Sequence, residues 1–150
     1  MIRGLRFKIP NEYNFFINKI TDGINKDTYV WGIFEDQVFV EKGDFLFDSD
    51  IYSGQKFNEI ISQSPYYATA LNLQVFPCET NIQQVKNYNE FLSSNCELVF
   101  LICDVIFVDI YSKSMKIIEI IRLNAQNNNF QEIEYITDEN DRIKEFDNYL

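Results

Sequence analysis

The sequence predicts an α/β (or α+β) fold, one domain over residues 1–150 whose mixed, mostly parallel sheet is flanked by about five helices. Strand patterns alternate with amphipathic helix patterns through short connections. In the second half, the order strand, helix, strand, helix, strand favours parallel neighbours joined by right-handed crossovers. Residues 98–111 are apolar on both faces, which is typical of a central strand. A hairpin in the first half must be antiparallel, so the sheet is expected to be mixed.

The N-terminal segment predicts a strand followed by a helix. Residues 2–10 alternate, with one apolar face formed by Leu5, Phe7 and Ile9. The next apolar side chains follow helical spacing, at Tyr13, Phe16, Ile17, Ile20 and Ile24. Asn11 is placed to cap this helix, Glu12 suits the positive end of its dipole, and Gly23 ends it.

The following segment predicts a β-hairpin and a short helix. Residues 28–48 contain two β-rich runs separated by a turn around Glu35 and Asp36. Asp50 or Ser53 is placed to cap the short helix, whose buried face would carry Phe57, Ile60 and Ile61.

The second half predicts three strands and three helices. The strands are expected at residues 69–76, 98–111 and 130–136. The helices are expected to begin at Thr80, at Ser112 or Ser114, and at Thr137 or Asp138.

The charge balance excludes one class of partner and suits another. The net charge is −10 at pH 7 and the isoelectric point is about 4.4. Binding to nucleic-acid phosphates depends on clustered Lys and Arg, so no nucleic-acid partner is expected. An acidic protein instead suits a basic protein partner.

The composition also excludes most catalytic and cofactor chemistry. Histidine is absent, which removes Ser-His-Asp and Cys-His arrangements and most catalytic zinc sites. No glycine-rich phosphate loop is present. Cys78, Cys96 and Cys103 have the spacing of neither a zinc motif nor a redox pair, so reduced thiols are expected. We therefore expect no catalytic residue, no metal ligand and no cofactor.

The expected location is the cytoplasm. No charged stretch followed by an apolar one opens the chain in the manner of a secretory signal. The longest apolar run, residues 98–108, is too short for a membrane span, so no membrane association is expected.

Two acids interrupt the apolar segment ELVFLICDVIFVDIYSKS, residues 97–114. Because side chains alternate along a strand, Asp104 and Asp109 would point to opposite faces, roughly 16 Å apart at about 3.3 Å per residue. They would therefore not form a catalytic pair. A carboxylate in a strand buried on both faces needs a partner, so Asp104 is expected to be buried and paired.

The candidate ligand site lies at one edge of the predicted sheet. In an open α/β sheet, ligands bind beyond the carboxyl ends of the parallel strands. The candidate ligand-binding residues at that edge are Asn11, Glu12, Cys78, Thr80, Ser112, Lys113, Asp138 and Arg142. The alternative is that they only cap helices, since most occupy N-cap positions.

A second acidic stretch does not predict a metal site. Asp44, Asp48 and Asp50 lack the spacing and the turn glycine of a calcium-binding loop. We expect a solvated loop there.

Three stretches, RGLRFKIPNEY, CDVIFVDIYSK and NNNFQEIEYITDEND, resemble a family of small uncharacterised bacterial proteins, mostly from low-GC Gram-positive organisms, catalogued as domain of unknown function 2691. The resemblance covers nearly the whole chain. The Arg that the family pattern places after EYITDEND is present as Arg142, whereas the preceding Gly is not. The resemblance implies a cytoplasmic bacterial protein and carries over no catalytic residue, cofactor or reaction.

Two functions compete on this basis. The first is a non-enzymatic protein-binding or regulatory module, of an inhibitor or immunity type, whose acidic and aromatic surface docks a basic protein. The second is a small-molecule-binding or weakly enzymatic α/β domain that uses the candidate residues at the sheet edge. A flat acidic face would favour the first function, and a deep pocket at that edge would favour the second.

Overall fold

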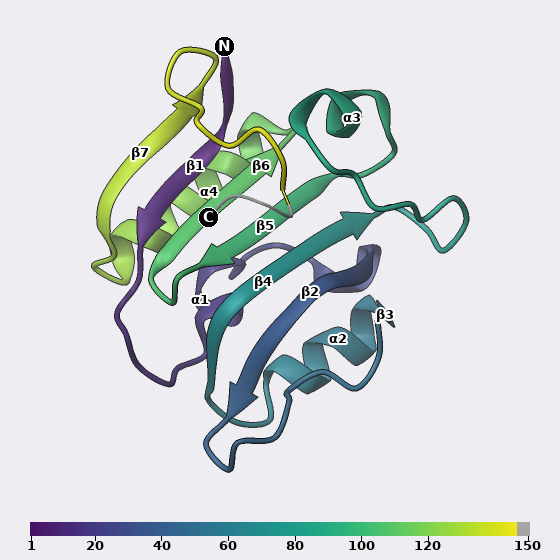
Figure 1. Cartoon of the computed structure of the whole chain (residues 1–150), viewed down its shortest axis with the longest axis vertical. Helices are drawn as coiled ribbons and strands as arrows, with labels where there is room; N and C mark the ends of the chain where they lie inside the picture. Colours follow the sequence, from purple (N-terminus) through teal and green to yellow (C-terminus); the bar gives the residue numbers. More distant parts are fainter. Residues whose placement is uncertain (147–150) are drawn as a thin grey trace.

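A seven-stranded antiparallel sheet organises the chain (Figure 1). The structure, a computed structural model, describes residues 1–146. The strands are β1 (Ile2–Lys8), β2 (Val30–Val40), β3 (Ile51–Ser53), β4 (Tyr66–Phe76), β5 (Leu98–Cys103), β6 (Phe107–Ser112) and β7 (Gln131–Thr137), in the sheet order β3-β2-β4-β5-β6-β1-β7. The helices are α1 (Phe16–Ile20), α2 (Gly54–Ile61), α3 (Tyr88–Ser93), α4 (Met115–Asn127) and the short 3-10 helix η1 (Lys26–Thr28).

The prediction of a mixed, mostly parallel sheet with about five helices is wrong. All neighbouring strands are antiparallel, and residues 1–146 contain four α-helices. The main cause is the segment 98–111, which forms the hairpin β5–β6 and not one central strand. The extra reversal of direction makes β4, β5 and β6 successive antiparallel neighbours.

The turn between β5 and β6 places Asp104 in solvent. Asp104 and Val105 have φ angles of +53° and +75°, and the Ile106 N–H donates to the Asp104 carbonyl at 2.9 Å. The prediction that Asp104 is buried and paired is therefore wrong. Asp109 on β6 is the largely buried acid of this segment, with 13% of its side chain exposed.

The predicted turn around Glu35 and Asp36 is also wrong. β2 continues through both residues and pairs with β4 along its length, with register shifts on either side of them. The chain reverses only after Val40. In this turn Gly43 has a φ of +90°, a backbone conformation that residues with a side chain rarely adopt.

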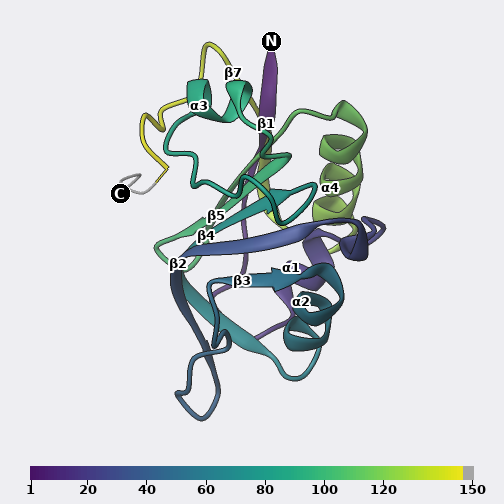
Figure 2. The same ribbon diagram turned by 90° about the vertical axis from the view of Figure 1, so that its right-hand side faces the viewer.

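Helices α1, α2 and α4 lie against one side of the sheet, the helical face (Figure 2). Its core holds the alternating apolar residues of the strands, and Trp31 of β2 stacks on Phe57 of α2 with ring centroids 4.3 Å apart. Two predicted caps are confirmed, since the Ser53 and Ser114 hydroxyls accept backbone N–H groups at the starts of α2 and α4.

Three other predicted helices differ from the structure. The first begins at Phe16, well after Asn11. The helix expected at Thr80 begins only at Tyr88, capped by the Asn87 side chain. No helix forms after Thr137 within the part of the chain that the structure describes. Residues 138–146 instead run as an irregular segment, here called the C-terminal segment.

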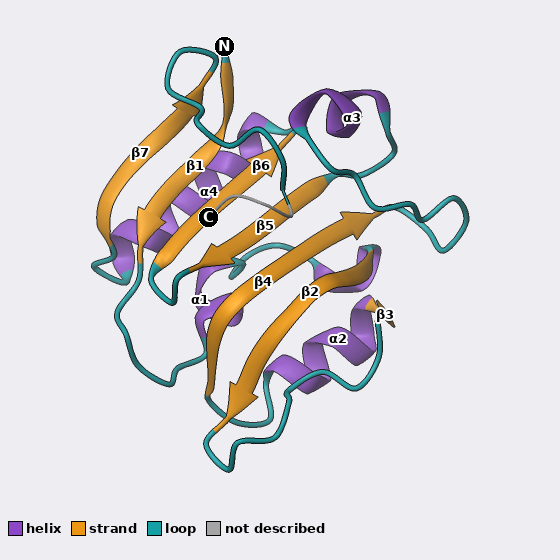
Figure 3. Ribbon diagram, viewed as in Figure 1, coloured by secondary structure: helices purple, strands orange, loops and turns teal. Residues whose placement is uncertain are grey.

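The other side of the sheet, the opposite face, is covered at one end only. We call this end the upper end, as in Figure 3; β4, β6 and β7 finish there. Helix α3 and the C-terminal segment lie over it. A second core under this cover includes Tyr88, Phe91, Val99, Tyr111 and Phe146. At the lower end, where β1, β2 and β5 finish, no described element covers the opposite face.

Candidate functional site

The antiparallel sheet separates the eight candidate ligand-binding residues. Asn11 and Glu12 follow β1 at the lower end. The residues that follow β4, β6 and β7 lie at the upper end; they are Cys78, Thr80, Ser112, Lys113 and Asp138. Arg142 lies in the C-terminal segment, which begins at that upper end. The premise of one shared edge at the ends of parallel strands is therefore wrong. A ligand-binding role for these residues remains a prediction.

Several of these residues make contacts that stabilise the fold. Lys113 Nζ donates to the Ser94 carbonyl at 2.6 Å, and the Ser112 hydroxyl accepts the Ser114 N–H at 3.1 Å. Asp138 accepts a hydrogen bond from Arg3 Nε at 2.9 Å. The Cys78 Sγ lies 3.0 Å from the Thr80 hydroxyl in an exposed loop.

At the lower end, the Asn11 side chain accepts a hydrogen bond from the Tyr67 hydroxyl at 2.7 Å. Glu12 accepts one from the Asn14 side chain at 2.9 Å. Of the eight candidates, Arg142 lines a large hollow of the described surface.

This hollow is a groove of about 680 Å³ on the lower half of the opposite face. Its floor comes from β1, β6 and the end of β5, β7 forms one side, and Arg142 and Ile143 form the upper wall. Phe107, 40% exposed, is an aromatic group of the floor. The volume lies within the range of small-ligand pockets, although the groove is open to solvent.

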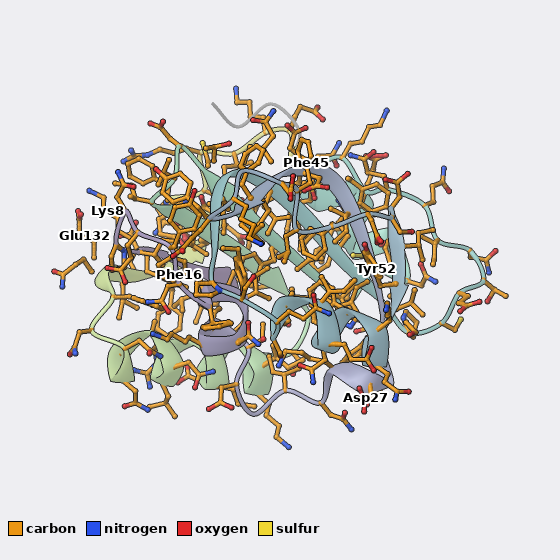
Figure 4. All side chains as sticks on the ribbon, turned by 90° about the horizontal axis from the view of Figure 1, so that it is seen from below. Lys8, Phe16, Asp27, Phe45, Tyr52 and Glu132 are labelled. Atoms are coloured by element: carbon orange, nitrogen blue, oxygen red, sulfur yellow. The ribbon has the colours of Figure 1, made fainter. Side chains whose placement is uncertain are left out.

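Ion pairs cross the floor of the groove. Arg6 Nε donates to Asp109 Oδ1 at 2.9 Å, and Arg6 also reaches Glu134 at 3.4 Å. Lys8 pairs with Glu132, and Figure 4 shows these two side chains next to each other at one side of the molecule. Burial raises the pKa of the Asp109 carboxyl, against the opposing effect of Arg6.

A row of four aromatic rings crosses the lower end of the sheet; we call Tyr13, Tyr67, Phe39 and Phe45 the aromatic row. Tyr13 and Tyr67 lie 5.3 Å apart between centroids, and Phe39 and Phe45 lie 4.9 Å apart. Phe39 is directly opposite Tyr67 in the β2–β4 register, which places the two pairs next to each other on the sheet. Phe45 is 59% exposed and lies on the side away from the helices (Figure 4).

The aromatic row is set among acids. Residues 35–50, the acidic segment, contain six acidic residues, Glu35, Asp36, Glu41, Asp44, Asp48 and Asp50, against the single base Lys42. Six acids and one base give −5, which is half of the net charge of −10. This segment includes Phe39 and Phe45 of the aromatic row.

A second hollow, of about 490 Å³, lies beside Phe45 and is lined by Asp36, Asp48 and Asp50. The Asp48 carboxylate accepts the Tyr52 hydroxyl at 2.7 Å, which shapes this loop. Asp36 Oδ1 is buried and has no hydrogen-bond partner among residues 1–146. Burial, together with nearby Asp50 and Glu35, raises the pKa of the Asp36 carboxyl, although the Val38 N–H opposes the shift.

Sequence reasoning missed the groove and the aromatic row. Arg6 falls on the polar side of the predicted first strand, and Phe45 falls in a further short strand that the sequence allows at residues 45–47. An apolar residue between acids, as in GDFLFD, is a signal that could have identified Phe45 as a surface anchor. The row itself depends on the β2–β4 register, which no local pattern encodes.

Two features are absent from the described part of the chain. Among residues 1–146, no cluster of three or more Cys, Asp or Glu side chains is placed to hold a metal ion. None of the helices in this range has the length and apolar composition of a membrane-spanning helix.

Comparison with known proteins agrees with the resemblance found in the sequence. A family model described as "Protein of unknown function (DUF2691)" matches residues 2–147. The chain is 38% identical over 146 residues to "Uncharacterized protein YncE" of Bacillus subtilis (strain 168), with 94% of this chain and 95% of that protein covered. No solved structure matches. The chain belongs to the DUF2691 family of proteins of unknown function.

Proposed function

We propose that the protein is a non-enzymatic binding or regulatory module, of an inhibitor or immunity type, that docks a basic protein partner. The docking surface consists of the aromatic row and the acidic segment. The observation that carries the proposal is Phe45, a large apolar side chain that is 59% exposed within a segment of net charge −5. Exposed aromatic side chains supply binding anchors, and charge of one sign selects partners of the other sign.

The shape of this surface supports docking of a protein. The rings of the aromatic row pack against one another in tilted pairs, so the row already has a fixed form before any partner binds. Glu41, Asp44, Asp48 and Asp50 are exposed around Phe45. The hollow lined by Asp36, Asp48 and Asp50 has room for a lysine or arginine side chain from the partner.

Affinity capture from the native host tests the proposal. The wild-type protein is expected to retain a basic protein at low salt and to lose it at high salt, because exposed charges are screened. Phe45→Ser and Asp44→Lys should each abolish retention. The matched controls are Leu123→Ser, an exposed apolar residue of α4, and Glu59→Lys, an exposed acid of α2. Equal retention by Phe45→Ser and Leu123→Ser, or retention of an acidic partner, would contradict the proposal.

The groove supports a second candidate function, the binding of a small molecule. The sheet edge on which this function was first predicted does not exist, but the groove has a suitable volume and combines Phe107 and Ile143 with charged side chains. Chemical-shift perturbation by a fragment library, mapped onto the amides around Phe107, would test it. An unperturbed groove would exclude this function.

A further inference from the structure

Most charges in the groove already have a partner. Arg6 is paired with Asp109 and Glu134, and Lys8 is paired with Glu132. Two lining residues of opposite sign remain, Arg142 and Asp104. Within residues 1–146, neither side chain makes an ion pair or a hydrogen bond. Counting contacts among residues 1–146 alone, the groove therefore offers one unpaired cation and one unpaired anion.

These two charges lie at different ends of the groove. Asp104 is in the β5–β6 turn at the lower end of the sheet. The C-terminal segment crosses the sheet above Arg6, since Arg6 donates to the Asn140 carbonyl at 3.3 Å, and Arg142 lies in the wall formed by this segment. On β6, Asp109 lies opposite Arg6 of β1. Phe107, two residues earlier on β6, lies opposite Cys103, the last residue before the turn. Phe107 therefore lies between the level of Arg6 and the turn.

We propose that the groove binds a short apolar peptide with free termini, its carboxylate at Arg142, its ammonium group at Asp104 and its side chains on Phe107 and Ile143. The inference rests on the second candidate function, small-molecule binding, and not on docking of a basic protein. Charge explains the choice of a zwitterion. The lining holds three cations and four acids, so an anion meets net repulsion, whereas a zwitterion satisfies both free groups.

The length of the groove sets the length of the peptide. Two residues of β6 separate the level of Asp109 from that of Phe107, a span of about 7 Å at about 3.3 Å per residue. The turn with Asp104 lies beyond Phe107. An extended chain covers about 3.3–3.6 Å per residue, so a peptide of about two or three residues spans the distance, whereas a single amino acid does not.

Isothermal titration with leucyl-phenylalanine and its derivatives tests the proposal. The dipeptide is expected to bind, while its N-acetylated and C-terminally amidated forms bind about tenfold more weakly, because each loses one hydrogen-bonded charge. Free phenylalanine should bind more weakly than the dipeptide. Binding of free phenylalanine as tightly as the dipeptide would overturn the assignment of a peptide.

Three variants locate the site. Arg142→Gln should weaken the dipeptide about tenfold and should not weaken the amidated form further, because both changes remove the same contact. Asp104→Asn should behave likewise toward the acetylated form; asparagine tolerates positive φ, so the turn is retained. Lys144→Gln, an exposed charge of the C-terminal segment outside the groove, is the control and should have no effect.

Two further results would overturn the proposal and differ in meaning. If the neutral N-acetyl-leucine amide binds in the groove as tightly as the dipeptide, small-molecule binding stands but the ligand is not a zwitterion. If no probe binds and the amides around Phe107 are unperturbed, the second candidate function fails together with the peptide.

Discussion

Arg6 on β1 and Asp109 on β6 lie directly opposite each other in the sheet, and their side chains form a hydrogen-bonded ion pair of 2.9 Å. Only 20% and 13% of these side chains are exposed. Arg6 also reaches Glu134 on β7 and the carbonyl of Asn140. Burial disfavours the charge on Arg6, but the hydrogen bonds that Arg6 donates to Asp109 and Glu134, together with the attraction of the Asp109 carboxylate, outweigh this effect and raise the pKa of the guanidinium. This pair therefore ties three strands to the C-terminal segment.

Removal of Arg6 is expected to be costly. Arg6→Met leaves Asp109 buried without its cation, and the free energy of unfolding should fall by about 3 kcal/mol. Arg6→Met combined with Asp109→Leu should recover most of this loss, because no buried charge remains. Lys8→Met, which breaks the more exposed pair with Glu132, should cost less than about 1 kcal/mol. Urea denaturation measures all three variants; equal losses for Arg6→Met and Lys8→Met would show that burial of the pair is unimportant.

The Gln74 side chain on the opposite face should hold the covering loop in place. Its amide donates to the Val85 carbonyl at 2.8 Å and accepts the Val85 N–H at 2.9 Å. Gln74→Leu leaves both buried groups unpaired, so the free energy of unfolding should fall by about 2–3 kcal/mol. Exchange of the Val85 amide hydrogen should accelerate. Gln83→Leu, at an exposed position of the same loop, should change neither quantity.

Asp36 should make stability depend on pH. Its folded-state pKa is raised by burial, so the stability linked to its protonation is present below the unfolded pKa near 3.8 and is lost as the pH rises through the folded pKa. Asp36→Asn should therefore be more stable than wild type at neutral pH, by about 1 kcal/mol, because it removes a buried charge with an unpaired oxygen. The difference should vanish as the pH falls toward 4, at roughly the model-peptide value for Asp.

Thermal or urea unfolding across this pH range measures the effect. Asp44→Asn, which neutralises an exposed acid of the same segment, should show no comparable pH-dependent gain. A gain for Asp36→Asn that is constant with pH would mean that the carboxyl does not titrate in the folded protein.

Strands and helices could be predicted from the sequence where one local signal dominated. β1, β4, β7, α2 and α4 were all expected, and the serine that caps each of the two helices was one of the two alternatives predicted for it. Topology was lost mainly at the segment 98–111, because the turn residues Asp104, Val105 and Ile106 include neither glycine nor asparagine. An apolar run in which Asp is the only turn-favouring residue type is more typical of one strand than of a hairpin. Tertiary pairing with β4 and β1 overrides that pattern.

The candidate site could be predicted less well because it depended on this topology. Parallel strands would have gathered the candidate residues at one edge, but antiparallel strands send Asn11 and Cys78 to different ends. The acidity and aromatic content of the chain were visible in its composition. Their coincidence around Phe45 required the register of β2 and β4 and the bridge between Phe39 and Phe45.

The β5–β6 turn leads to a prediction about stability. Val105 is β-branched and has a φ of +75°, a conformation that strains such a residue. Val105→Gly should relieve this strain and raise the free energy of unfolding by about 1 kcal/mol, which chemical denaturation measures. Gly43→Val, which introduces the same strain at a φ of +90°, is the reverse control and should destabilise by a similar amount. A loss of stability in Val105→Gly would show that packing of the valine side chain outweighs its strain.

Of the three cysteines, Cys78 should be the most reactive. A helix beginning at Thr80 would have favoured its thiolate, but α3 begins only at Tyr88. Solvent exposure sets the order of reactivity instead, since Cys78 is exposed and Cys96 and Cys103 are buried. Burial raises the pKa of Cys96 to about 12 and that of Cys103 to about 11.

At neutral pH these shifts leave Cys103 with roughly a hundredfold less thiolate than an ordinary thiol, since each pKa unit is a factor of ten. Timed alkylation of the native protein, followed by peptide mapping, should therefore modify Cys78 first and leave Cys96 unmodified until the protein unfolds. Cys78→Ser should abolish the fast phase, and urea should equalise the three rates. If Cys103 were alkylated as fast as Cys78, the β5–β6 turn would have to open on the time scale of the reaction, and the floor of the groove beneath Phe107 would not be a fixed surface.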